Sequence, residues 1–243
     1  MLKNEAVSGK KILLVDDEAE ILELLSTVLK KEGFDQIVCA SKGADAVSKC
    51  ELEKPDIVVL DIMLPDMDGY EVCKKMREFT LIPIIFLSAK TDDIDKLLGL
   101  GIGGDDYVTK PFSPKEIAFR IKAQFRRNEY LSQYKKRENS TIAFGEVIID
   151  TTAGEVIKSG IPVILTAKEY QLLVYLAEHP NQILSKSKIC DAVWGEDYIG
   201  HDNTIMVHIR HLREKLEENP SKPKWILTVK GLGYKLQTRS HST

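Results

Sequence analysis

The sequence lacks the features that mark membrane, secreted and metal-thiolate proteins. None of its apolar runs approaches the roughly 18 residues of a membrane span. The first residues, MLKNEAVSGKK, contain no apolar segment of signal-peptide length. The four cysteines, Cys39, Cys50, Cys73 and Cys190, lie far apart and form no CxxC pair. We therefore expect a cytoplasmic protein with reduced thiols, in preference to a disulfide framework or a thiolate metal site.

Aromatic residues are also few, at 7%, and the chain shows no internal repeat or low-complexity segment. At 43% hydrophobic and 29% charged, it is too apolar for a disordered chain. Its 243 residues suit one large or two ordinary domains. The net charge of −3 is unevenly spread, with acidic residues in excess over 1–123 and basic residues in excess over 202–239.

The first half alternates short apolar runs with helical patterns. Helical spacing recurs in segments such as EAEILELLSTVLKKEG, where Gly33 suits the C-terminal stop. Alternation of this kind predicts a parallel sheet with helices on both faces. We expect a doubly wound, flavodoxin-like α/β domain of five strands and five helices. The expected strands are KILLVDD, QIVCA, DIVVLD, PIIFLS and DYVTK.

The second half has a different pattern after a charged segment, QFRRNEYLSQYKKRENS, that extends the last helix into a linker. Short strands broken by glycine and proline fill 141–165 and predict a small antiparallel sheet. Thr166 and Glu169 form a capping box that opens a helix ending before Pro180. Helices over 185–194 and 203–217 and a hairpin in WILTVKGLGYKL complete an α+β winged-helix order. The expected units are residues 10–128, a linker at 129–140, and residues 141–238.

Carboxylates follow the expected strands of the first domain. Asp16 and Asp17 end the first strand, and the apolar run IVVL leads directly into Asp61. In a flavodoxin-like sheet the first and third strands meet where the strand order reverses, and ligands bind there. Carboxylate oxygens crowded together suit Mg²⁺.

A helix N-cap is the alternative role for each of these acids. Asp17 and Asp68 both precede helical patterns and suit it, whereas Asp61 precedes IMLP and does not. We expect Asp68 to cap the next helix and Asp66 to lie solvated in the turn at Pro65.

Two more strand ends supply a hydroxyl and a cation. PIIFLS ends at Ser88, and DYVTK ends at Lys110. Either residue alone is an ordinary surface residue. Beside a carboxylate cluster with Mg²⁺, however, an ammonium and a hydroxyl suit the oxygens of a phosphoryl group.

The motifs LLVDDE, VVLDIMLPDMDG, IIFLSA and GGDDYVTKPF together resemble the receiver domain of bacterial two-component response regulators, over about residues 10–128. The resemblance implies that Asp61 accepts a phosphoryl group from a phosphohistidine on a sensor histidine kinase. It further implies a cis peptide bond before Pro111 that positions Lys110. The implied Mg²⁺ ligands are Asp17 directly, Asp16 through water, Asp61, and the Met63 backbone carbonyl. The implied phosphoryl-contact and switch residues are Lys110, Ser88 and Tyr107.

Activation of such regulators implies a homodimer on the face built from the fourth helix, the fifth strand and the fifth helix. This chain carries charges that suit ion pairs across that face. Three unrelated surface charge pairs are the alternative, and exposed pairs are individually weak. The expected pairs are Lys96 with Glu116, Asp106 with Arg120, and Asp105 with Arg127.

The expected helix over 203–217 has two distinct faces. Ile205, Ile209, Leu212 and Leu216 form one apolar stripe. A mixture of polar and small apolar residues that suits a DNA major groove lies opposite. An ordinary amphipathic helix is the alternative, and a domain of balanced charge is not a strongly basic footprint. The opposite face carries Asn203, Thr204, Val207, Arg210, His211 and Glu214.

The motifs LTAKEYQLLVYLAEHP, AVWG, NTIMVHIRHLREKL and ILTVKGLGYKL resemble the winged-helix effector of OmpR/PhoB-type regulators, over about 142–237. The resemblance implies sequence-specific binding of promoter DNA through the helix at 203–217 and through the wing. The segment from Gly195 to His201 is then expected to face RNA polymerase or to set spacing. The implied DNA-contacting residues are Asn203, Thr204, Val207, His208, Arg210, His211, Arg213, Thr228 and Lys230.

This chain departs from the family pattern at Asn203, at Met206 and at the pair Arg210–His211, where the family often has Arg, Asp and two Arg. Fewer fixed cations predict a shallower salt dependence of DNA binding.

Two other functions compete with a phosphorylation-controlled regulator. A Mg²⁺-dependent aspartyl-phosphate hydrolase typically has a second Asp two residues after the nucleophile, where this chain has Met63, so we expect no enzyme beyond self-phosphorylation and slow autodephosphorylation. A constitutive DNA-binding protein would not need the acids, hydroxyl and cation found together at the strand ends.

Overall fold

A computed structural model describes residues 9–89, 102–134, 141–195 and 203–238. The chain divides into two compact units, residues 1–126 and 127–243. Helix α5 (Pro114–Tyr134) spans the division.

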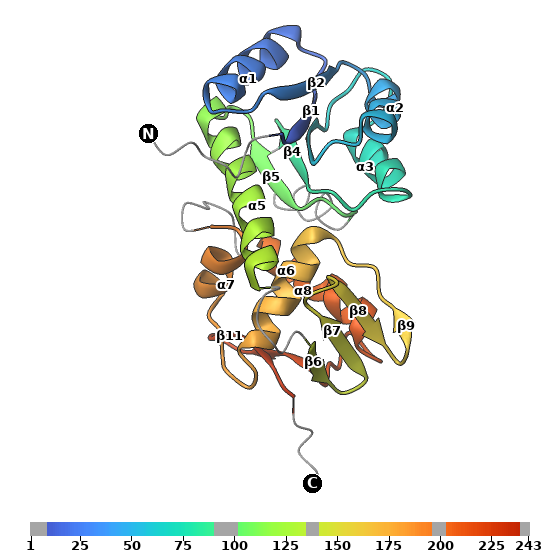
Figure 1. Ribbon diagram of the computed structural model, residues 1–243, viewed down its shortest axis with the longest axis vertical. Helices are drawn as coiled ribbons and strands as arrows, with labels where there is room; N and C mark the ends of the chain where they lie inside the picture. The colour runs from blue at the N-terminus through green and yellow to red at the C-terminus, as the bar shows by residue number, and fades with distance from the viewer. Residues whose placement is uncertain (1–8, 90–101, 135–140, 196–202, 239–243) are drawn as a thin grey trace. The chain divides into compact units, whose positions relative to one another are not determined.

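The first unit is built on a five-stranded parallel sheet (Figure 1). Its strand order is β2-β1-β3-β4-β5, as expected for the flavodoxin-like topology. This order places β1 and β3 side by side, with Val15 paired to Leu60. The strands are β1 (Lys11–Val15), β2 (Gln36–Ala40), β3 (Ile57–Asp61), β4 (Ile84–Ser88) and β5 (Asp106–Thr109).

Helices cover both faces of this sheet and enclose two apolar cores. Alternate strand residues point to opposite faces, so Leu14 belongs to one core and Leu13 to the other. Helices α1 (Ala19–Lys31) and α5 pack on the first face. Helices α2 (Gly43–Glu53) and α3 (Gly69–Arg77) pack on the second. The fourth helix expected in the family falls on residues outside those described.

The helix ends partly match the expectations from the sequence. Gly33 follows the C-cap of α1 with φ of +97°, a backbone conformation that glycine adopts without strain. Asp68 caps α3, because its side chain accepts a hydrogen bond from the Tyr70 amide at 2.8 Å. Glu18 is the N-cap residue of α1, so Asp17 is not needed for that role.

The structure corrects the expectation that Asp66 is simply solvated in the turn at Pro65. Its carboxylate accepts hydrogen bonds from the amides of Gly43 at 2.7 Å and Ala44 at 3.0 Å, at the start of α2. These two bonds lower the pKa of Asp66. The residue is exposed but holds the first turn of a helix from another part of the chain, so it is not simply solvated.

The second unit has the expected winged-helix order. An antiparallel sheet of β6 (Thr141–Phe144), β7 (Val147–Asp150), β8 (Glu155–Lys158) and β9 (Ile161–Pro162) comes first. Three helices follow, α6 (Ala167–Glu178), α7 (Lys186–Val193) and α8 (Asn203–Leu216). The hairpin of β10 (Ile226–Val229) and β11 (Gly233–Leu236) forms the wing.

The helices of this unit begin and pack as their sequences predict. Both hydrogen bonds of the capping box between Thr166 and Glu169 are present at the start of α6. Helix α8 buries its apolar stripe in the core of the unit. The stripe residues Ile205, Ile209, Leu212 and Leu216 are all buried. None of the described helices combines the length and the hydropathy that a membrane-spanning helix requires.

Candidate functional site

The strand order brings two buried carboxylates together. The pairing of Val15 with Leu60 places the next residues, Asp16 and Asp61, side by side at the carboxyl ends of β1 and β3. Asp16 is 1% exposed and Asp61 is 3% exposed. Asp17 is exposed beside them, and one carboxylate oxygen from each of the three lies within 4.8 Å of the others. This convergence is the one expected from the strand ends.

Lys110 joins this group from the end of β5. Its Nζ donates to Asp16 Oδ2 at 2.9 Å and to Asp61 Oδ2 at 2.8 Å, and it lies 3.6 Å from Glu18 Oε1. The Lys110–Pro111 peptide bond is cis, as the resemblance implied. A pocket of about 480 Å³ opens over Asp17, Asp61 and Lys110, with Met63 and Ala89 also at its wall.

The site holds more negative than positive charge. Burial raises the pKa of Asp16, and the hydrogen bonds from Lys110 and the Glu18 amide offset only part of that effect. For Lys110, burial alone would lower the pKa, but the hydrogen bonds to Asp61 and Asp16 outweigh it and raise the pKa. Three carboxylates facing one ammonium leave an anionic pocket lined by oxygen ligands, and that donor set fits Mg²⁺.

Glycine at position 69 lets the chain pack against the backbone of Asp61. A Cβ atom there would lie 2.3 Å from the Asp61 carbonyl oxygen and 2.7 Å from Ile62 Cα. The Gly69 amide donates to the Ile62 carbonyl at 2.8 Å, and the Met63 amide donates to Asp61 Oδ1 at 3.2 Å. The segment after β3 therefore holds the Asp61 carboxylate in place.

The hydroxyl and aromatic residues of the expected switch lie on β4 and β5. Ser88 is fully buried, and its carbonyl accepts the Lys110 amide. Tyr107 is 9% exposed, with its ring centroid 6.5 Å from that of Phe86. The Tyr107 ring is thus packed inward, beside Phe86 of the neighbouring strand β4.

Comparison with known proteins assigns both units to known families. Residues 12–122 match the response regulator receiver domain, and residues 160–236 match the C-terminal domain of transcriptional regulatory proteins. The alkaline phosphatase synthesis transcriptional regulatory protein PhoP of Bacillus subtilis (strain 168) is 45% identical over 234 residues, covering 94% of this chain and 97% of PhoP. The chain belongs to the OmpR/PhoB-type response regulators.

Other relatives agree with this assignment. Transcriptional regulatory protein YvrH of Bacillus subtilis (strain 168) is 44% identical, with 94% of this chain and 96% of YvrH covered. Among solved structures, the OmpR/PhoB homolog DrrB of Thermotoga maritima matches with a TM-score of 0.50 at 30% identity, covering 94% of this chain and 99% of DrrB. This response regulator is therefore a two-component transcription regulator with a DNA-binding domain.

On the expected dimer face, the described charges already have partners within the chain. Arg120 contacts Asp106 at 2.9 Å and Glu116 at 2.7 Å. Asp105 is fully buried, and its carboxylate contacts Arg77 at 2.8 Å. This ion pair differs from the pair with Arg127 that the sequence predicted. Lys96 and the side chain of Arg127 lie outside what the structure describes.

Helix α8 presents a different set of residues from the expected one. Met206, Arg210 and Glu214 are exposed at i, i+4 and i+8, and Val207 is half-buried. Thr204 is 5% exposed and His208 is 1% exposed, so these two side chains are placed in the interior and not at a DNA-facing surface. The side chain of Asn203 lies outside the described residues.

Arg213 links the helix to the wing. Its Nε donates to the Ile226 carbonyl at 2.9 Å, and its terminal nitrogen donates to Thr228 Oγ1 at 2.8 Å. The sequence placed Arg213 and Thr228 together at DNA but did not indicate that they bind each other. Lys230 is exposed near the tip of the wing.

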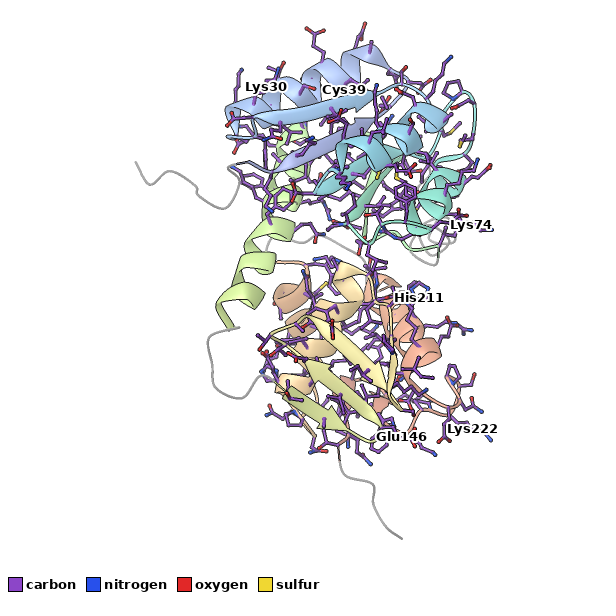
Figure 2. All side chains as sticks on the ribbon, turned by 45° about the vertical axis from the view of Figure 1, so that its right-hand side comes forward. Lys30, Cys39, Lys74, Glu146, His211 and Lys222 are labelled. Carbon is purple, nitrogen blue, oxygen red and sulfur yellow. The ribbon has the colours of Figure 1, made fainter. Side chains whose placement is uncertain are left out.

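His211 also differs from the expectation. Its Nδ1 lies 3.3 Å from Glu169 Oε1, and its side chain is 17% exposed. Figure 2 labels His211 among the side chains of α8. His211 and Glu169 are far apart in sequence. The capping-box motif predicts only a local role for Glu169, so this contact could not be predicted from it.

Proposed function

We propose that Asp61 accepts a phosphoryl group from the phosphohistidine of a sensor histidine kinase. An Asp61 carboxylate oxygen forms the new bond to phosphorus while the phosphorus–nitrogen bond breaks. The electron pair returns to the departing imidazole, which takes a proton from solvent. The observation that carries this proposal is the buried Asp61 carboxylate, 2.8 Å from Lys110 Nζ, at the wall of an open pocket.

Each neighbour has a role in this proposal. Lys110 compensates charge on the phosphoryl oxygens, and Ser88 and Tyr107 respond to the modified site as switch residues. Mg²⁺, when bound, would neutralise further negative charge on the transferring group. Its proposed ligands are Asp16, Asp17, Asp61 and the Met63 carbonyl.

Intact-mass measurement with acetyl phosphate and Mg²⁺ tests this site. We expect the wild-type protein to gain one phosphoryl group and Asp61→Asn to gain none. Asp66→Asn is the matched control, because it removes a neighbouring carboxylate that lies outside the cluster. An undiminished gain in Asp61→Asn would contradict the assignment of Asp61.

We further propose that phosphorylation promotes a homodimer through the face that includes β5 and α5. Glu116, Asp106 and Arg120 are its described charges, and Lys96 is its expected partner on the fourth helix. Arg77 holds Asp105 inside the receiver, so we leave the pair of Asp105 with Arg127 out of this proposal. Of these three charges only Glu116 has a largely accessible side chain, at 37%, whereas Arg120 and Asp106 are 10% and 2% exposed. Charges at such a face set register more than affinity.

Sedimentation velocity with and without acetyl phosphate tests the dimer. Arg120→Ala should shift the phosphorylated protein toward monomer, since it removes the cation between Asp106 and Glu116. Lys122→Ala on the same helix is the control, because Lys122 contacts Glu32 instead. Equal sedimentation of both phosphorylated variants and the wild type would count against this face.

Finally, we propose that the dimer binds promoter DNA in the cytoplasm in a sequence-specific way, with RNA polymerase as a partner. Accessibility to solvent supports a DNA-contacting role for Val207 and Arg210 on α8 and for Lys230 on the wing. Arg213 and Thr228 are supported as a joined pair between helix and wing. Asn203 stays in the proposed interface on the resemblance alone.

A further inference from the structure

The capping glutamate of α6 contacts more than its own helix. Glu169 Oε2 accepts the Thr166 amide at 2.8 Å, which completes the capping box. The same oxygen accepts Lys215 Nζ at 2.5 Å, and Oε1 lies 3.3 Å from His211 Nδ1. A capping box needs only the first of these bonds, whereas the other two come from α8.

The electrostatics of Glu169 show that these contacts are favourable despite burial. Its side chain is 3% exposed, and burial by itself would raise its pKa. The hydrogen bonds from His211 and Lys215 outweigh that effect and bring the pKa to about 2. Glu169 is therefore a fixed negative charge between two helices, held by groups on both.

The positions of His211 and Lys215 make the contact relevant to DNA reading. They are one helical turn apart, and each directly follows a residue of the exposed face, Arg210 or Glu214. With side chains a helix has a radius of about 5 to 6 Å, so a rotation of about 20° moves a surface atom by about 2 Å. A displacement of that size is enough to break a hydrogen bond to a base edge. Glu169 is placed to prevent this rotation.

A second set of contacts from the neighbouring residue supports the same arrangement. Lys168 is fully buried, and its Nζ donates to the Val193 carbonyl at 2.6 Å, near the end of α7. The Lys168 Nζ lies 5.4 Å from the Trp194 ring centroid, which in turn lies 5.3 Å from the ring of His208 on α8. Two consecutive residues of α6 thus contact α7 and α8 separately.

We propose that Glu169 is a positioning residue for DNA recognition, which fixes the rotational setting of α8 through His211 and Lys215. It contacts no DNA itself. The inference rests on the proposed sequence-specific DNA binding and adds a residue of α6 to the determinants of that specificity.

The test uses the full-length protein and two duplexes. One duplex is enriched from a randomised library by the wild-type protein, and the other is a scrambled duplex of the same composition. Glu169→Gln should lower affinity for the enriched duplex by about tenfold, the size of one charge-assisted hydrogen bond, and should leave scrambled-duplex affinity unchanged or higher. Loss of an anion by itself would strengthen DNA binding, so a fall cannot come from net charge.

Lys215 provides a second pair of variants with little risk to folding, because its side chain is 35% exposed. Lys215→Gln should lower the ratio of specific to non-specific affinity, and Lys215→Arg should restore it by keeping the cation. Ile149→Val removes one core methyl group from β7 and controls for a general loss of stability. It should leave the ratio unchanged.

Several results would overturn the proposal. One is that Glu169→Gln and Lys215→Gln leave the ratio of specific to non-specific affinity unchanged, including the case in which both affinities fall by the same factor. Ile149→Val could lower the ratio as much as Glu169→Gln does, which would make the effect one of stability. If the wild-type protein enriches no duplex, the proposed DNA recognition fails and this inference fails with it.

Discussion

Replacing Glu169 with glutamine should destabilise the second unit at neutral pH and much less in acid. The carboxyl pKa falls from its ordinary 4.5 to about 2 on folding. At about 1.4 kcal/mol for each tenfold change, this corresponds to about 3 kcal/mol of stability. Glutamine keeps the shape and an acceptor oxygen, so about 3 kcal/mol is the upper bound of the loss.

The sign of the pH dependence follows from the lowered pKa. A group whose pKa is lower in the folded state contributes its full stability above the unfolded pKa, here 4.5, and loses it as the pH falls toward 2. The difference between wild type and Glu169→Gln should therefore be largest at pH 7. Near pH 3 it should shrink to about 1.5 kcal/mol.

Urea unfolding followed by tryptophan fluorescence measures this in the full-length protein. The two tryptophans, Trp194 and Trp225, both belong to the second unit, so the signal reports that unit alone. Ile149→Val serves as a control whose loss should not change with pH. A wild-type-to-variant difference that is equal at pH 7 and pH 3 would refute the reasoning.

Three other predictions concern the receiver and the DNA interface. Gly69→Ala should cost about 1 to 3 kcal/mol in urea unfolding followed by circular dichroism and should slow phosphorylation by acetyl phosphate, because the new methyl group would meet the Asp61 carbonyl. Arg77→Ala should destabilise the receiver by about 3 to 5 kcal/mol, since it leaves Asp105 buried without its cation. Combining Arg77→Ala with Asp105→Asn should recover part of this stability. If the double variant recovers none, the loss does not come from the buried charge of Asp105. Lys230→Ala should weaken binding to all duplexes alike and reduce the salt slope measured by fluorescence anisotropy by about one, whereas a sequence-dependent loss would point to base reading instead.

The sequence alone determined the features that depend on local periodicity and on residues at strand ends. Alternating apolar runs and helical patterns gave the doubly wound order, because strands and helices differ in the period of their buried residues. The site followed from the same pattern, since the order β2-β1-β3-β4-β5 brings the ends of β1 and β3 together. The Thr166–Glu169 capping box and the apolar stripe of α8 are likewise local, and both are present as predicted.

The tertiary structure decided how polar side chains pair across the chain. Asp66 caps a helix that begins 23 residues earlier, and Arg77 binds an aspartate 28 residues later. The period of apolar residues predicts which face of a helix is buried. It does not predict how much of the rest of the helix surface the neighbouring helices cover. Contacts with α6 and with Trp194 at the end of α7 bury His208 and bring His211 to Glu169. The exposed face of α8 is therefore narrower than the sequence predicted.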